Sequence, residues 1–176
     1  NDFLIVENNK FRELLNETVQ SKDIYAKVLV DKDSPYLKTI ILNKGSKNNV
    51  RIGMAIVDSS YLVGKIIEVN YTNSRALLLS DLNSKIPVLL EPIDVHAVLS
   101  GTGKNYGVIE YTKNEHDQKI SGKEIIVYTS GYGGLFKSGL PVGKIIIDDK
   151  TKENRVNFFS DFRQLDYVKI VSYDIG

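Results

Sequence analysis

The feature of the sequence that most constrains its fold is an internal repeat. Short stretches of the first half recur in the same order in the second half, 70 residues later at first and then 79 or 80 residues later. Such self-similarity indicates two tandem units of one structural type. The recurring pairs are Val28-Leu29 with Val98-Leu99, Ile56-Val57 with Ile126-Val127, Val63-Gly64-Lys65-Ile66-Ile67 with Val142-Gly143-Lys144-Ile145-Ile146, Ser80-Asp81 with Ser160-Asp161, and Val88 with Val168.

From residue 22 onwards, short runs rich in β-branched residues alternate with residues suited to turns. The runs predict strands, and the Gly, Asn and Pro residues between them predict the turns. We therefore expect a mainly β chain, with an N-terminal α-helix followed by two tandem small β-barrels. The expected domains are a coiled-coil helix over 1–21, the first barrel over 22–92 and the second over 93–176.

The first 20 residues contain no Gly or Pro and favour a helix. Their apolar spacing follows steps of four and three residues, which is typical of a coiled-coil seam. A single buried Asn in such a seam can fix the register of two helices. We expect dimerisation through this helix, although the same pattern also suits an amphipathic helix packed on its own domain. The seam residues are Leu4, Asn8, Phe11 and Leu15.

The change of offset from 70 to 79 locates an insertion in the second unit. Eleven residues, 131–141, stand where the first unit has only Tyr61-Leu62. The glycines of the insertion permit positive φ angles, so we expect a tightly turned loop. Leu135, Phe136 and Leu140 are expected to plug the end of a barrel or the junction between units. Alternatively, the loop contacts a partner, with Tyr132, Leu135 and Phe136 as the candidate residues.

The two best repeated motifs have structural interpretations. In Val-Gly-Lys-Ile-Ile, the glycine allows a bend or bulge at a barrel corner, the isoleucines enter the core and the lysine stays solvated. In Ser-Asp, side-chain oxygens are expected to accept hydrogen bonds from backbone N–H groups of a turn.

Composition excludes much catalytic chemistry. The chain has no Cys and two His, and its net charge of +1 gives no reason to expect nucleic-acid binding. We expect no cofactor, no metal site and no enzyme activity. The alternative is a chymotrypsin-like hydrolase of two barrels, in which His96, Asp117 and Ser130 follow the chain order of the catalytic triad. Ser130 also matches Ser60 of the first unit, so duplication explains its presence without catalysis.

No stretch approaches the roughly 20 apolar residues that a transmembrane helix needs. The chain begins at Asn1 within the expected helix. We interpret it as a fragment and expect any membrane anchor to lie upstream.

Several motifs together resemble the MreC family of rod-shape-determining proteins. The resemblance covers nearly the whole chain, and it departs from the family at Lys137-Ser138, where members often have Pro. The matching stretches are Leu42-Asn43-Lys44-Gly45-Ser46, Gly53-Met54, Thr129-Ser130-Gly131, Gly139-Leu140-Pro141-Val142-Gly143 and Asp161-Phe162.

This resemblance implies a single-pass inner-membrane protein with a coiled coil and two β-barrels outside the membrane, in the periplasm or its equivalent. It also implies a non-enzymatic scaffold of the cell-elongation machinery that self-associates. The implied partners are MreD, RodA, the MreB cytoskeleton system and the penicillin-binding transpeptidase of elongation. Family barrels can exchange strands, so the boundary near Pro92 is open to that exchange.

Overall fold

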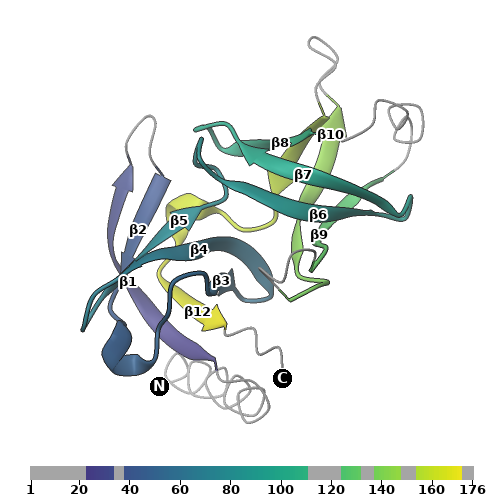
Figure 1. Cartoon of the computed structure of the whole chain (residues 1–176). Helices are drawn as coiled ribbons and strands as arrows, with labels where there is room; N and C mark the ends of the chain where they lie inside the picture. The colour runs from purple at the N-terminus through teal and green to yellow at the C-terminus, as the bar shows by residue number, and fades with distance from the viewer. Residues whose placement is uncertain (1–22, 34–37, 111–123, 132–136, 148–153, 172–176) are drawn as a thin grey trace, which may run out of the picture.

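A computed structural model describes residues 23–33, 38–110, 124–131, 137–147 and 154–171. Within these residues the chain forms two β-barrels that lie side by side (Figure 1). The expected helix over 1–21, with its seam, lies outside the described residues. The strands are β1 (Ile24–Asp33), β2 (Lys38–Leu42), β3 (Ala55–Asp58), β4 (Tyr61–Val69), β5 (Ser74–Leu78), β6 (Lys85–Glu91), β7 (Val95–Gly101), β8 (Tyr106–Glu110), β9 (Ile126–Thr129), β10 (Pro141–Ile147), β11 (Asn154–Phe158) and β12 (Tyr167–Val171).

Both barrels are closed, and each has six strands in the same spatial order. The first runs β1-β12-β3-β4-β5-β2, and the second runs β7-β6-β9-β10-β11-β8. Each strand of the first barrel thus has a counterpart at the same place in the second, and the sequence repeats coincide with these counterparts. The prediction of two small β-barrels from the repeat is confirmed.

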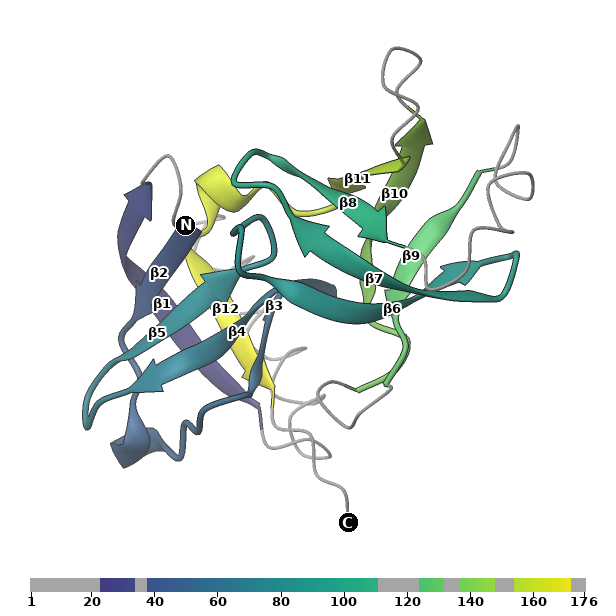
Figure 2. The ribbon, with the colours of Figure 1, turned by 45° about the horizontal axis from the view of Figure 1, so that its top comes forward.

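The last strand of each repeat belongs to the other barrel. β6 ends the first repeat but pairs with β7 and β9 of the second barrel. β12 ends the second repeat but pairs with β1 and β3 of the first barrel. Figure 2 shows β12, in yellow, among the strands of the first barrel. The expected boundary at residues 92/93 therefore separates the sequence repeats, whereas the barrels comprise 24–78 with 167–171, and 85–158.

The repeated Val-Gly-Lys-Ile-Ile motif forms a bulge in both barrels. The pairing of β4 with β3 shifts register at Val63, and that of β10 with β9 shifts at Val142. A Cβ atom on Gly64 or Gly143 would collide with a carbonyl oxygen of the neighbouring strand, so the backbones approach closely there. The expected bulge and glycine role are confirmed.

The expectation that both isoleucines of this motif enter the core is wrong. Ile66 and Ile145 are buried, but Ile67 is 37% exposed and Ile146 is 47% exposed. The reason is strand geometry, because successive side chains of a strand point to opposite faces. Only the first isoleucine of each pair can therefore face the barrel interior.

Each barrel has its own apolar core. The larger buried side chains of the first are Ile40, Leu42, Ile56, Ile66 and Ile170, while those of the second include Leu79, Ile86, Leu90, Leu99 and Ile125. Ala55 and Leu62, from strands β3 and β4 of the first barrel, belong to the second core. The two barrels are therefore joined by buried apolar contact as well as by the chain.

Candidate functional site

Two segments carry the chain between the barrels, and both contain the repeated Ser-Asp. The first crossover (79–84) links β5 to β6, and the second crossover (159–166) links β11 to β12. In the first, the buried carboxylate of Asp81 accepts hydrogen bonds from the backbone N–H groups of Asn83 and Lys38, both at 2.7 Å. In the second, Asp161 accepts from the backbone N–H of Arg163 at 3.0 Å. The expected turn role of Ser-Asp is confirmed for both aspartates.

The second crossover also fastens the barrels together. The buried hydroxyl of Ser160 donates a hydrogen bond of 2.6 Å to the carboxylate of Asp58, at the end of β3. Phe162 packs against both cores and stacks on Phe158 with ring centroids 4.7 Å apart. This crossover is thus held by polar and apolar contacts on both barrels, which fixes the surfaces beside it.

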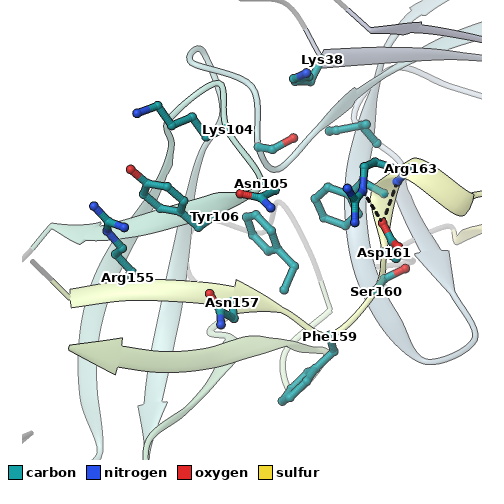
Figure 3. Close-up of a pocket in the computed structure, with 14 residues that line it drawn as sticks. Lys38, Lys104, Asn105, Tyr106, Arg155, Asn157, Phe159, Ser160, Asp161 and Arg163 are labelled. Atoms are coloured by element: carbon teal, nitrogen blue, oxygen red, sulfur yellow. Dashed lines mark hydrogen bonds and ion pairs between the residues drawn. The ribbon is translucent and has the colours of Figure 1, made fainter. Parts of the chain in front are cut away.

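A recess of about 460 Å³ lies beside the second crossover, which we name the inter-barrel pocket. Its walls come from the start of β2, the turn between β7 and β8, the end of β11 and the crossover itself (Figure 3). The volume falls in the range of ligand pockets. The lining residues are Lys38, Leu78, Ser80, Lys104, Asn105, Tyr106, Arg155, Asn157, Phe158, Phe159, Ser160, Asp161, Phe162 and Arg163.

The lining combines aromatic rings with an excess of positive charge. Four basic side chains, Lys38, Lys104, Arg155 and Arg163, face a single acidic one. The guanidinium of Arg155 lies 4.3 Å from the ring centroid of Tyr106, a cation–π contact. The pocket is therefore suited to a ligand that has both an apolar body and a negative charge.

The single carboxylate of the pocket already has a basic partner. Arg163 approaches Asp161 with its Nε atom 3.3 Å from Oδ1. The backbone N–H of Arg163, followed by its side chain, lowers the pKa of the Asp161 carboxyl from the ordinary value of 3.8. Asp161 consequently stays ionised at neutral pH, and its charge is offset mainly by Arg163.

The predicted contact residues Tyr132, Leu135 and Phe136 lie outside the described residues, but the base of their loop is well defined. Thr129, which is buried, closes the base with its hydroxyl, which donates to the carbonyl of Lys137 at 2.6 Å and accepts from the N–H of Leu140 at 2.9 Å. Gly131 and Gly139 have φ angles of 73° and 84°, as predicted for a tight turn. Leu140 packs against the second core, in agreement with a plug role for that residue.

The residues of the alternative hydrolase are not gathered into a triad by the described strands. His96 is an exposed residue of β7, whereas Ser130 follows β9. Strand β6 lies between these two strands, so the two backbones are separated by about 10 Å at the usual strand spacing. Asp117 lies outside the described residues. A nucleophile and its base need a hydrogen bond between them, and strand order does not favour one here.

Sequence reasoning missed most of the inter-barrel pocket. Lys38, Lys104 and Tyr106 belong to no motif, and Arg163 follows the repeated Ser-Asp without being repeated itself. The available signal was the pair Arg75 and Arg155, together with the recurrence of Ser-Asp. Because this recurrence marks both crossovers, it indicated the place in the fold where the barrels meet.

Two searches of the described part of the chain gave negative results. His, Asp and Glu side chains there form no group of three that could hold a metal ion. None of its helices has the length and apolarity required to span a membrane.

Fold and surface together define a tandem double β-barrel protein with exchanged terminal strands. Residues 28–172 match the family model described as "Rod shape-determining protein MreC, barrel core". The chain belongs to this family.

Curated relatives agree with that assignment. The cell shape-determining protein MreC of Cereibacter sphaeroides is 33% identical over 144 residues, covering 82% of this chain and 47% of the relative. The protein of the same name from Haemophilus influenzae is 34% identical over 146 residues, covering 82% of this chain and 41% of the relative. The chain thus spans about half the length, or somewhat less, of these relatives.

Solved structures show the same architecture. A structure named MreC has a TM-score of 0.77 at 27% identity, covering 96% of this chain and 99% of its own. MreC from Pseudomonas aeruginosa has a TM-score of 0.73 at 25% identity, covering 85% and 99%. A complex between penicillin-binding protein PBP2 and MreC from Helicobacter pylori contains a chain with a TM-score of 0.55 at 15% identity, covering 85% and 99%, a likeness of fold alone.

Proposed function

We propose that this chain is a non-catalytic scaffold of the bacterial cell-elongation machinery, which maintains rod shape by self-associating and by binding peptidoglycan-synthesis enzymes. The observation that carries the proposal is the family match over residues 28–172, which includes all but the first few residues of both closed barrels. Closed barrels leave no free sheet edge, so partners meet side-chain surfaces and loops. The proposal places the barrels outside the inner membrane, with an anchor upstream of residue 1.

The first partner we propose is the penicillin-binding transpeptidase of elongation. The Helicobacter pylori complex supports this choice, because in it a chain of similar fold is bound to PBP2. MreD, RodA and the MreB cytoskeleton system are further proposed partners, and the support for them is family membership. No cofactor or nucleic acid enters the proposal.

The proposed contact loop carries Tyr132, Leu135 and Phe136. Support comes from its base, where two hydrogen bonds of the buried Thr129 hydroxyl hold Lys137 and Leu140 in place. A loop with a rigid base can present large side chains to a partner with little loss of conformational entropy.

The test of this contact uses two double variants of the same chain. Tyr132→Ala with Phe136→Ala should abolish co-purification with the transpeptidase while leaving the unfolding midpoint within the range of surface substitutions. The matched control is Tyr71→Ala with Tyr167→Ala, because these tyrosines are 69% and 54% exposed in the first barrel. Unchanged transpeptidase affinity in the loop variant, or equal loss in the control, would contradict the proposed contact.

Self-association is proposed to occur through Leu4, Asn8, Phe11 and Leu15. In a longer chain that carries further heptads before residue 1, we expect a dimer in analytical ultracentrifugation. Leu4→Asp with Phe11→Asp should give monomers, because two charges in an apolar seam are poorly solvated there. A monomer before any substitution would refute the coiled-coil proposal.

A further inference from the structure

The inter-barrel pocket has a chemistry that the proposed scaffold function does not explain. Its four basic side chains against one acidic side chain give a local charge of +3, in a chain whose net charge is only +1. The charge of the pocket is thus greater than that of the whole molecule. A concentration of one sign in a recess attracts ligands of the opposite sign.

The basic groups come from separate parts of the fold and meet only in the tertiary structure. Lys38 begins β2 of the first barrel, Lys104 lies in the turn before β8 of the second, and Arg163 lies in the second crossover. Figure 3 shows Lys104, Tyr106 and Arg155 on one side of the pocket and Asp161 and Arg163 on the other. A ligand in the pocket would therefore touch both barrels and the crossover.

The geometry of these groups is held by contacts already described. Tyr106 lies under the guanidinium of Arg155 at 4.3 Å, and Arg163 is held by Asp161. Ser160, at the back of the pocket, is fixed by its hydrogen bond of 2.6 Å to Asp58. Basic groups that are positioned in advance lose less entropy when a ligand binds.

The remaining walls select among anionic ligands. Phe158, Phe159 and Phe162 add apolar surface, while the amides of Asn105 and Asn157 can donate hydrogen bonds. A nucleic acid or an anionic membrane needs an extended basic surface, which a single recess in a nearly neutral chain does not offer. Carboxylates beside apolar side chains suit this lining, and an acidic peptide provides both.

We propose that the inter-barrel pocket binds an acidic peptide segment of a partner protein, with its carboxylates beside Lys104, Arg155 and Arg163 and an apolar side chain against the aromatic wall. This inference rests on the proposed scaffold function for its biological setting. The binding itself is a property of the isolated chain and can be measured without any member of the elongation machinery.

The test is an NMR titration of the ¹⁵N-labelled chain with the peptide Ac-Glu-Phe-Asp-Leu-NH₂. We expect shifts of the backbone amides of Asn105, Tyr106 and Asn157, and no shifts with the uncharged peptide Ac-Gln-Phe-Asn-Leu-NH₂. Raising the salt concentration from about 0.05 to 0.5 M should weaken binding severalfold, because salt screens partly exposed charges. Absence of these shifts, or equal shifts with both peptides, overturns the proposal.

Variants localise the effect. Lys104→Gln with Arg163→Gln should weaken peptide binding about five- to tenfold, from the loss of two exposed ion pairs. Both residues are exposed, and Lys104→Gln alone decides the matter if the double variant fails to fold. The matched control is Lys47→Gln with Arg51→Gln, two exposed cations outside the pocket. Unchanged binding in the pocket variant, or equal weakening in the control, counts against the pocket.

Two further probes separate the ligand classes. Soluble peptidoglycan fragments and phosphatidylglycerol vesicles should leave the amides of Asn105, Tyr106 and Asn157 unchanged. Saturation of these amides by either probe in preference to the peptide overturns the assignment to a protein partner. If the chain binds the transpeptidase but the peptide shifts none of these amides, the pocket proposal fails while the scaffold function stands.

Discussion

Ending the chain at Gln164 should unfold the first barrel and leave the second folded. The second barrel is formed by one continuous stretch, 85–158, whereas the first needs β12 from the far end of the chain. Without β12, strands β1 and β3 lose their common neighbour and the barrel opens. Two new sheet edges then expose unpaired backbone groups to water.

The size of the effect follows from the burial of β12. Its two core side chains, Val168 and Ile170, are 3% and 0% exposed. Burying each of them contributes roughly 1.5–3 kcal/mol, so their removal costs about 3–6 kcal/mol before any hydrogen bond is counted. A domain of ordinary stability has about 5–15 kcal/mol in total, and a small barrel lies at the lower end. The truncated first barrel should therefore be mostly unfolded.

The assay is a ¹⁵N correlation spectrum of the truncated chain, with hydrogen exchange on the same sample. Amides of Leu99 and Val127 in the second barrel should keep their dispersion and protection. Amides of Leu42 and Ile56 in the first barrel should lose both. A peptide covering residues 165–176, added in trans, should restore part of the protection in the first barrel.

A point variant provides a milder form of the same test. Ile170→Ala should lower the free energy of unfolding by about 2–5 kcal/mol, as expected for a buried isoleucine. Tyr167→Ala, on the same strand but 54% exposed, is its control and should cost far less. The topological reasoning is refuted if the truncated chain keeps native signals in the first barrel, or if both barrels unfold together.

Three other substitutions test single contacts. Gly64→Ala should destabilise the chain by more than about 2 kcal/mol in urea unfolding, because its Cβ would meet the carbonyl oxygen of Leu77; a neutral result would contradict the close approach. Ser160→Ala should cost about 1.5 kcal/mol through loss of the hydrogen bond to Asp58, and an unchanged urea midpoint would show that this bond contributes nothing. The folded-state pKa of Asp161 is below 3.8, so its stabilising effect is complete above that pH and disappears as pH falls through the folded pKa. Urea midpoints of Asp161→Asn and the unchanged chain should therefore converge at low pH, and a constant difference would argue against this titration.

Much of the architecture was predictable from local patterns. Strands follow from β-branched runs between turn residues, and the recurrence of Val63-Gly64-Lys65 as Val142-Gly143-Lys144 predicted two similar units with a bulge in each. These features depend on residues close together in the chain, which is why one sequence could reveal them. The turn role of Asp81 and Asp161 was predictable for the same reason, since each accepts from an N–H two residues ahead.

The exposed isoleucines show where local patterns mislead. Ile66 and Ile67 are equally apolar, so composition alone placed both in the core. Alternation along β4 buries the first and leaves the second 37% exposed.

Sequence by itself thus determined the fold class, the duplication and the turn chemistry, because each is written in neighbouring residues or in their recurrence. Only the tertiary structure decided which barrel receives β6 and β12, since both strands have patterns that suit either barrel. The inter-barrel pocket was decided there too. Its charges lie far apart in the sequence, at Lys38, Lys104 and Arg163, and become neighbours only because the exchanged strands bring the two barrels together around one crossover.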